Sequence, residues 1–244
     1  MFIADLKNGF GTNIFLQTSS EKIRIMLAKA VEFMTNTKDP SHDMDHVNHL
    51  LQDANRFFIS TGHQIDIDQE VLLLAIYWHD VWKSQIKPSA RNYLFQQLYE
   101  GLGSMFMFKN YAKTVGLSPR MIRDVSYAIR KHSAIQGFPA KTLEAQLLWD
   151  VDILDIWNSK RTQRSFKSLR WTNISLFDSY MLYLKKASFH LNFEWTRNEV
   201  RKIKPPFFAE MSKFRESLMN RNKRSSSLAL QSKVTTANPQ LHQH

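Results

Sequence analysis

The segment LLLAIYWHDVWKS, residues 72–84, is the most informative about the fold because it joins the most apolar part of the chain to a titratable pair. Seven uncharged and mostly apolar residues precede His79 and Asp80, and Lys83 follows three residues after the aspartate. Apolar side chains around a whole circumference predict a helix, over about 68–83, at the centre of a hydrophobic core. A buried pair of this kind is unfavourable without a polar partner, so we expect a compensating cation beside it.

Helical periodicity continues on both sides of this segment. Ser20 and Ser118 stand where helix caps are expected, with Pro119 at a first helical position, and another helix restarts after Pro40 at about His42. Further helices are predicted over about 20–36, 90–114, 141–158, 174–189 and 207–221. No run of alternating apolar and polar residues indicates a strand. The pattern therefore predicts an all-α fold: an N-terminal extension over 1–19, a single helical domain over 20–222, and a flexible basic tail over 223–244.

Composition narrows the protein class. The 244 residues, 43% of them hydrophobic, suffice for one sizeable core. Because there is no cysteine, disulfides and thiolate zinc sites are excluded, which leaves His, Asp and Glu as metal ligands. The longest apolar run, Val71–Trp78, is far shorter than the roughly 20 residues of a membrane helix, and Asp5 and Lys7 interrupt any signal peptide. We expect a cytoplasmic protein without a transmembrane segment; no pattern indicates its oligomeric state.

The formal charge of +11 is concentrated in the C-terminal part. Residues 1–150 contain 16 Lys and Arg against 15 Asp and Glu, whereas residues 151–244 contain 17 against 7. A basic segment attracts phosphate-bearing ligands, nucleic acid or an acidic surface by general electrostatics, and it is equally compatible with a solvated face. Nucleic acid is therefore one candidate partner of the C-terminal part.

Several titratable side chains fall on predicted apolar helix faces. Helical spacing places His46 on the buried stripe and His49 on the polar face. His132 likewise follows the apolar side chains of its helix. In AQLLWDVDILDIW, residues 145–157, positions two apart lie about 200° around the axis, so Asp150 and Asp152 cannot both face one site. An inward histidine is more often a hydrogen-bonded core residue than a ligand, but several together favour a metal site.

In order along the chain, the segments HDMDHVNHLL, AIYWHDVWK, IRDVSYAIRKHS and TLEAQLLWDVDILDIWNSKR resemble the HD-domain superfamily of metal-dependent phosphohydrolases. The resemblance spans roughly residues 20–220 and is strongest to the small bacterial branch with HDxxHxxRV and DADxLD motifs. It implies an HD-type helical domain whose metal ligands are His46, His79, Asp80 and Asp152. A donor set of this kind suits one divalent ion, such as Mn, Fe, Mg, Ni or Co. We expect a single metal, because only His132 lies between Asp80 and Asp152.

The resemblance also implies an enzyme that hydrolyses a nucleotide or another small phosphorylated substrate. In this interpretation Asp80 both ligates the metal and orients the attacking water, while Lys83 and His132 bind the phosphate and act in catalysis. The chain departs from the family pattern where Val81–Trp82 replaces small residues and where Ile156–Trp157 follows the last motif. These bulky side chains are expected to narrow the substrate pocket.

Two other interpretations compete. HDMDH imitates a zinc-protease helix, with His42 and His46 as ligands and Asp43 as the base, but Pro40 and Ser41 start the helix at His42, outside any buried turn, and no third ligand follows. The second is a binding module for nucleic acid or another anionic partner, in which the metal site is structural or vestigial. The chain offers charge for such a module but no stacking or groove-reading motif.

Overall fold

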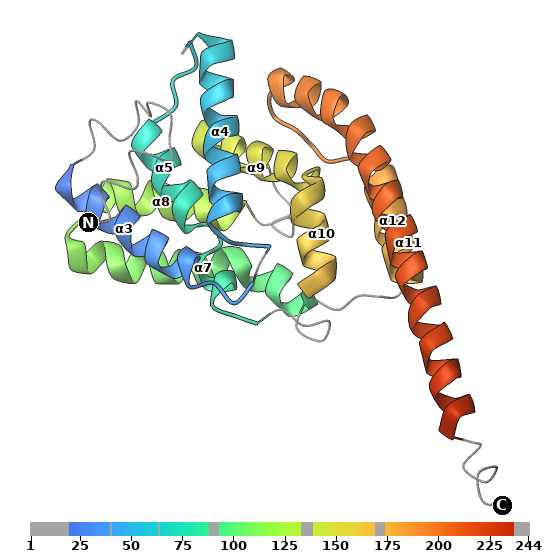
Figure 1. The fold of residues 1–244 in the computed structure, drawn as a ribbon. Coiled ribbons are helices and arrows are strands. Elements are labelled where there is room, and N and C mark those ends of the chain that lie inside the picture. The colour runs from blue at the N-terminus through green and yellow to red at the C-terminus, as the bar shows by residue number, and fades with distance from the viewer. Residues whose placement is uncertain are drawn as a thin grey trace, which may run out of the picture.

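The regular structure is helical in the computed structural model, which describes residues 20–39, 41–62, 64–87, 93–132, 139–168 and 174–236 (Figure 1). No strand occurs among these residues, which confirms the all-α prediction. The predicted extension over 1–19 lies outside the described residues. The elements are α3 (Glu21–Thr35), α4 (Met44–Thr61), α5 (Gln69–Trp78), α6 (Val81–Ser84), α7 (Tyr93–Val115), α8 (Pro119–Lys131), α9 (Leu143–Ile156), α10 (Ser159–Ser168), α11 (Ile174–Lys186) and α12 (Glu194–Thr236).

Side-chain caps define the helix starts. The hydroxyl of Ser20 accepts the backbone N–H of Ile23, and Ser118 caps α8 with Pro119 in the first turn, as predicted. Helix α4 begins two residues later than expected, because a carboxylate oxygen of Asp43 accepts the N–H of His46 at 3.1 Å. Local sequence therefore specifies these starts to within two residues.

The single helix expected over 68–83 is wrong in one respect, because the chain breaks at the His-Asp pair. Helix α5 ends at Trp78, α6 begins at Val81, and Asp80 between them adopts φ −112° and ψ 8°. Adjacent residues of a continuous helix point about 100° apart. The break lets the neighbouring side chains of His79 and Asp80 approach each other, as their 3.2 Å separation shows.

Two hydrophobic clusters stabilise the chain. The first cluster is built by α3–α9, and α5 lies at its centre because all side chains from Val71 to Trp78 are buried, as predicted. The second cluster is built by α10–α12 with the residue that follows α9. Its buried members are Trp157, Phe166, Phe177, Leu184, Phe207, Met211, Phe214 and Leu218. Helix α12 joins the clusters, because it contacts both α9 and α10.

The C-terminal third differs most from the sequence-based expectation. Helix α10 had no counterpart in the predicted elements. The helix predicted over 207–221 is part of α12, which starts at Glu194, passes through Pro205 and Pro206, and continues past Asn222 to Thr236 (orange to red in Figure 1). Prolines normally end a helical pattern, so the sequence places this helix start too late. In the described part of the chain, none of the helices combines the length and apolarity that crossing a bilayer requires.

Candidate metal centre

His79 is positioned by the end of α5. Its backbone N–H still donates to Ala75, and its imidazole is fully buried. Ring atom Nδ1 lies 2.7 Å from the carbonyl oxygen of Ile76. A carbonyl can only accept, so Nδ1 carries the proton and the lone pair of Nε2 points into the site. This is the tautomer that a metal ligand requires.

His46 enters the site from the first turn of α4. Its imidazole is fully buried, whereas the side chain of His49 is 38% exposed, which confirms the predicted faces of this helix. Atom Nδ1 of His46 lies 2.6 Å from Oδ2 of Asp155, and Nε2 lies 3.1 Å from Nε2 of His79. Two nitrogens with lone pairs facing each other at this distance repel unless a proton or a cation lies between them.

Two carboxylates complete the group around these imidazoles. Oδ2 of Asp80 lies 3.2 Å from Nε2 of His79 and 3.5 Å from Nε2 of His46, and Oδ1 of Asp152 lies 3.5 Å from the same His46 atom. The donor atoms of His46, His79 and Asp152 all lie within 4.8 Å of one another. The structure thus brings together the four residues that the family resemblance selected, and this group could hold a metal ion.

Asp150 points elsewhere, as the helix register predicts. Its carboxylate accepts the backbone N–H groups of Asn192 and Phe193 at 2.9–3.1 Å and the side-chain amide of Asn192 at 2.8 Å. Burial raises its pKa despite these bonds. Asp150 therefore links α9 to the start of α12, while Asp152, two residues on, faces the metal centre.

Sequence reasoning missed a supporting layer behind the ligands. Asp155 binds His46, and Nη1 of Arg161 binds Asp155 at 3.0 Å and lies 3.9 Å from Asp152. Burial disfavours the ionised form of Asp155, but Arg161 and the hydrogen bonds of His46 and His49 hold its pKa well below the usual range. No local pattern predicts the ion pair between Asp155 and Arg161, because the pair depends on α10, which was not among the predicted helices.

The position of His42 differs from the sequence-based prediction, which placed this residue outside any buried turn. It is only 9% exposed, its Nδ1 lies 2.8 Å from Asp39, and its Nε2 lies 3.6 Å from Oδ2 of Asp80. Burial and the charge of Lys83 lower its pKa. His42 therefore lies between Asp39 and Asp80, with one ring nitrogen facing each carboxylate.

His132 ends α8 on the opposite side of Asp80. Its Nδ1 lies 2.5 Å from the carbonyl of Ile129, which again makes Nδ1 the donor, and its Nε2 lies 3.6 Å from Oδ1 of Asp80. The ring is 2% exposed, and Nε2 has no hydrogen-bond partner among the described residues. Burial disfavours the protonated ring, but the contact with Asp80 outweighs this effect and raises the pKa of His132 to about 9.

Lys83 lies beside the site but is already paired. The side chain is almost completely buried, and Nζ binds Oε2 of Glu100 on α7 at 2.6 Å. Both residues line the same cavity as Asp80 and His132. The predicted contact between Lys83 and a phosphate therefore stays a prediction, since a substrate would share the ammonium of Lys83 with Glu100.

A cavity of about 670 Å³ opens from the metal centre toward the second cluster. Its polar end includes His42, Asp80 and Arg161, and its apolar end includes Ile156 and Phe166. Of the bulky residues expected to narrow the pocket, Ile156 does line it. Trp82 and Trp157 are absent from the described lining: the indole of Trp82 occupies the space where a Cβ on Gly103 would stand, and Trp157 packs in the second cluster.

Acidic and basic groups meet at the polar end of the cavity. Its lining contains the acidic residues Asp39, Asp80, Glu100 and Asp152, the basic residues Lys83 and Arg161, and the imidazoles of His42 and His132. Burial opposes ionisation of Asp80, but the surrounding histidines, His79 first, hold its pKa well below the usual range. A divalent cation would be attracted to these carboxylates, so the donor set suits a metal.

Comparisons with protein-family models, with curated proteins and with solved structures return no match for this chain. The structure itself has a helical domain with a buried His/Asp group that could hold a metal, and this arrangement is compatible with an HD-type fold.

Proposed function

We propose that the protein is an HD-type metal-dependent phosphohydrolase that acts on a nucleotide or another small phosphorylated compound. The observation that carries the proposal is the convergence of His46, His79 and Asp152 within 4.8 Å, with Asp80 beside them. These residues come from two helices, α4 and α9, and from the break after α5, in the order that the family resemblance predicts. The cavity beside them is large enough for a small ligand.

The residues present suit one divalent ion with nitrogen and oxygen ligands. His46, His79, Asp80 and Asp152 would hold it, and Mn, Fe, Mg, Ni or Co match this donor set. Such an ion supplies Lewis-acid activation of water and neutralises charge on the phosphoryl group. Asp155 and Ile76 keep the two imidazoles in the ligand tautomer, so the protein prepares the donors before any ion binds.

The remaining polar residues would bind and orient the substrate. Arg161 lines the cavity next to Asp152, and its guanidinium can donate to phosphoryl oxygens. His132 presents its Nε2 from the other side of Asp80, where it can donate a proton to the leaving group. Asp80 lies between His79 and His132 and is placed to orient a water molecule.

Elemental analysis of the purified protein, followed by assays of nucleotides and phosphomonoesters with Mn²⁺ or Mg²⁺, tests the proposal. We expect about one tightly bound divalent metal per chain and hydrolysis that a chelator abolishes. A content near two would contradict a mononuclear site. Absence of hydrolysis across the panel, in metal-loaded protein, would contradict the enzymatic proposal.

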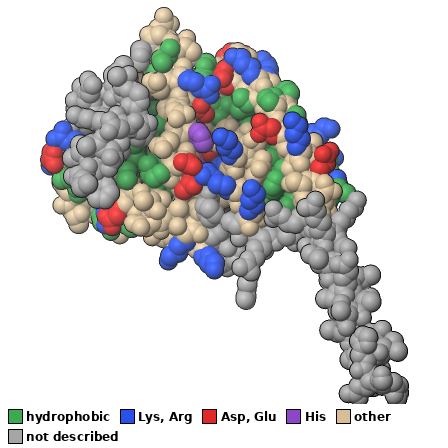
Figure 2. Space-filling view, in the orientation of Figure 1, with side chains coloured by type: hydrophobic (Ala, Val, Ile, Leu, Met, Phe, Trp, Pro, Cys, Tyr) green, Lys and Arg blue, Asp and Glu red, His purple; other side chains and the backbone are tan. Residues whose placement is uncertain are grey.

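The alternative of an anionic-partner binding module rests on the basic C-terminal part alone. On the face shown in Figure 2, Lys and Arg side chains of the described residues are interspersed with Asp and Glu rather than gathered in one stripe. Nucleic-acid surfaces usually concentrate positive charge. A salt-dependent shift with oligonucleotides, in protein that hydrolyses no phosphate ester, would favour this alternative.

A further inference from the structure

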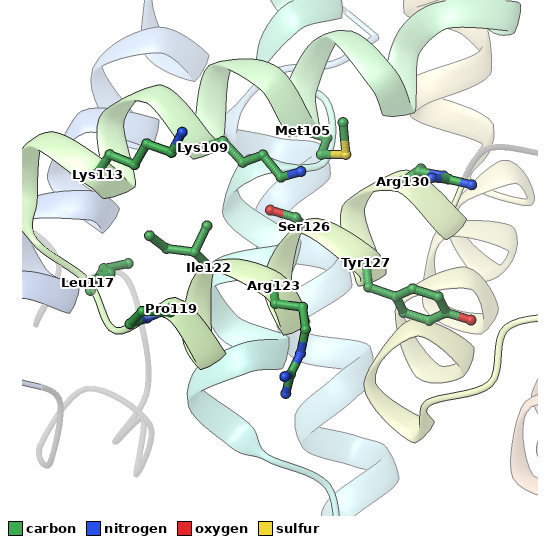
Figure 3. A pocket seen from close by; sticks show the side chains of 10 residues that line it. All are labelled: Met105, Lys109, Lys113, Leu117, Pro119, Ile122, Arg123, Ser126, Tyr127 and Arg130. Carbon is green, nitrogen blue, oxygen red and sulfur yellow. The ribbon is translucent and has the colours of Figure 1, made fainter.

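A second cavity lies away from the metal centre, in a groove between α7 and α8 (Figure 3). These helices form a hairpin around Gly116, whose φ of 73° is the left-handed conformation that glycine adopts without strain. The groove has a volume of about 650 Å³, which is in the range of small-molecule sites. None of the predicted metal or phosphate-binding residues lines it.

Four cationic side chains border the groove: Lys109 and Lys113 from α7, and Arg123 and Arg130 from α8. The described lining contains no Asp or Glu. Arg123 binds the neighbouring Asp124 at 2.8 Å, whereas no described acidic residue pairs with Lys109 or Lys113. Residues 1–150 are nearly neutral as a whole, so this groove is a local concentration of positive charge.

The floor of the groove is apolar with one unsatisfied hydroxyl. Met105 and Ile122 contribute apolar surface between the helices. Ser126 is only 3% exposed, and its Oγ has no hydrogen-bond partner among the described residues. Figure 3 shows this hydroxyl directed into the space between α7 and α8, on the side where Lys109 extends. A buried hydroxyl without a partner points to a ligand that supplies one.

From these features we propose that the groove binds an organic phosphate, in which a phosphate group is joined to an apolar group. The lysines of α7 would contact the phosphate oxygens, and the hydroxyl of Ser126 would donate to one of them. Met105 and Ile122 would cover the apolar group. The apolar floor matches the apolar group of such a ligand, and the cationic border matches its phosphate. The site does not depend on the metal centre.

Phenylphosphonate is a suitable probe, because it combines a phosphonate dianion with a phenyl ring through a bond that phosphohydrolysis does not cleave. The full chain, in EDTA, is titrated while the methyl NMR signals of Met105 and Ile122 are followed. We expect saturable shifts of both signals. If neither signal shifts, even at concentrations of phenylphosphonate that saturate another site on the protein, the proposal is overturned.

Matched variants then assign the charge. Lys109→Gln with Lys113→Gln should raise the Kd for phenylphosphonate five-fold or more. Lys186→Gln with Lys213→Gln removes the same charge from exposed positions on α11 and α12 and should change the Kd less than two-fold. Equal losses in both double variants would show that only net charge matters, and would overturn the proposed site.

The hydroxyl and the apolar floor are tested separately. Ser126→Ala should raise the Kd two- to ten-fold without shifting the melting temperature, because a hydrogen bond to the ligand is lost. An unchanged Kd would contradict the proposed hydrogen bond between the hydroxyl of Ser126 and the ligand. Inorganic phosphate and benzyl alcohol should each bind at least five-fold more weakly than phenylphosphonate. Equal affinity for either fragment would contradict a site for both parts of the ligand.

Discussion

The two hydrophobic clusters contribute in different ways to the metal centre. Helices α3–α9, around the first cluster, supply all four candidate metal ligands from positions at or near the ends of buried segments. Helices α10–α12, around the second cluster, supply Arg161 and the apolar end of the cavity. The first cluster therefore provides the candidate metal donors, whereas the second completes the space a substrate would occupy. Substitutions in the two regions should therefore have separable effects on metal content, stability and turnover.

The largest expected effect is on metal binding by the first region. Asp152→Ala removes a proposed ligand that faces His46, so the metal content should fall from about one per chain to nearly none. Turnover should fall about 1,000-fold or more, equivalent to roughly 4 kcal/mol. Elemental analysis and steady-state kinetics measure these effects. Full metal occupancy in this variant would show that Asp152 is not a ligand.

The next effect concerns the buried ion pair of the first region. Lys83→Ala leaves the carboxylate of Glu100 buried without its partner, which should lower the free energy of unfolding by about 3–5 kcal/mol in urea titrations. The double variant Lys83→Met with Glu100→Gln should recover most of this stability. If the single variant is as stable as the wild type, the pair is accessible to water and Lys83 is available to a substrate.

The connection between the two regions depends on Asp150. Asp150→Ala leaves the N–H groups of Asn192 and Phe193 without their acceptor, so unfolding should become easier by about 1–3 kcal/mol. The metal content should stay near one per chain, because this carboxylate faces away from the centre. Loss of the metal with stability unchanged would mean that the register of α9 differs from the one described.

The second region is tested by Arg161. Arg161→Gln should keep the metal but lower kcat/KM ten- to hundred-fold, about 1.4–2.7 kcal/mol, because a charge-assisted contact to the phosphoryl group is lost. Arg161→Lys should recover only part of the rate, because Lys lacks the planar fork of donors. Wild-type kcat/KM in Arg161→Gln would limit the second region to a structural role.

The smallest effect is expected at the C-terminus. The second cluster ends at Leu218 among the described residues, so truncation after Asn222 should change the melting temperature by no more than a few degrees and leave turnover nearly unchanged. The sequence predicts a flexible tail from residue 223, although the backbone of α12 is helical to Thr236. A large loss of turnover would show that this segment reaches the site.

Local patterns made much of the first region predictable. Caps at Ser20 and Ser118 and the apolar circumference of α5 depend on neighbours within a few residues, and each matches the structure. The second region was less predictable, because its helices contain prolines and charged residues whose burial depends on distant partners. Arg161, for example, belongs to a strongly polar helix, yet contacts with Ser41 and Asp155 bury it.

The helical class, the central place of α5 and the inward face of His46 are predictable from the chain alone, because periodicity and capping act between residues that are close along it. Three features depend on how the helices pack: α5 breaks at His79 and Asp80, His42 turns inward, and Asp155 fixes the tautomer of His46 from 109 residues away. Contacts over such separations form when whole helices pack, and no local pattern encodes them.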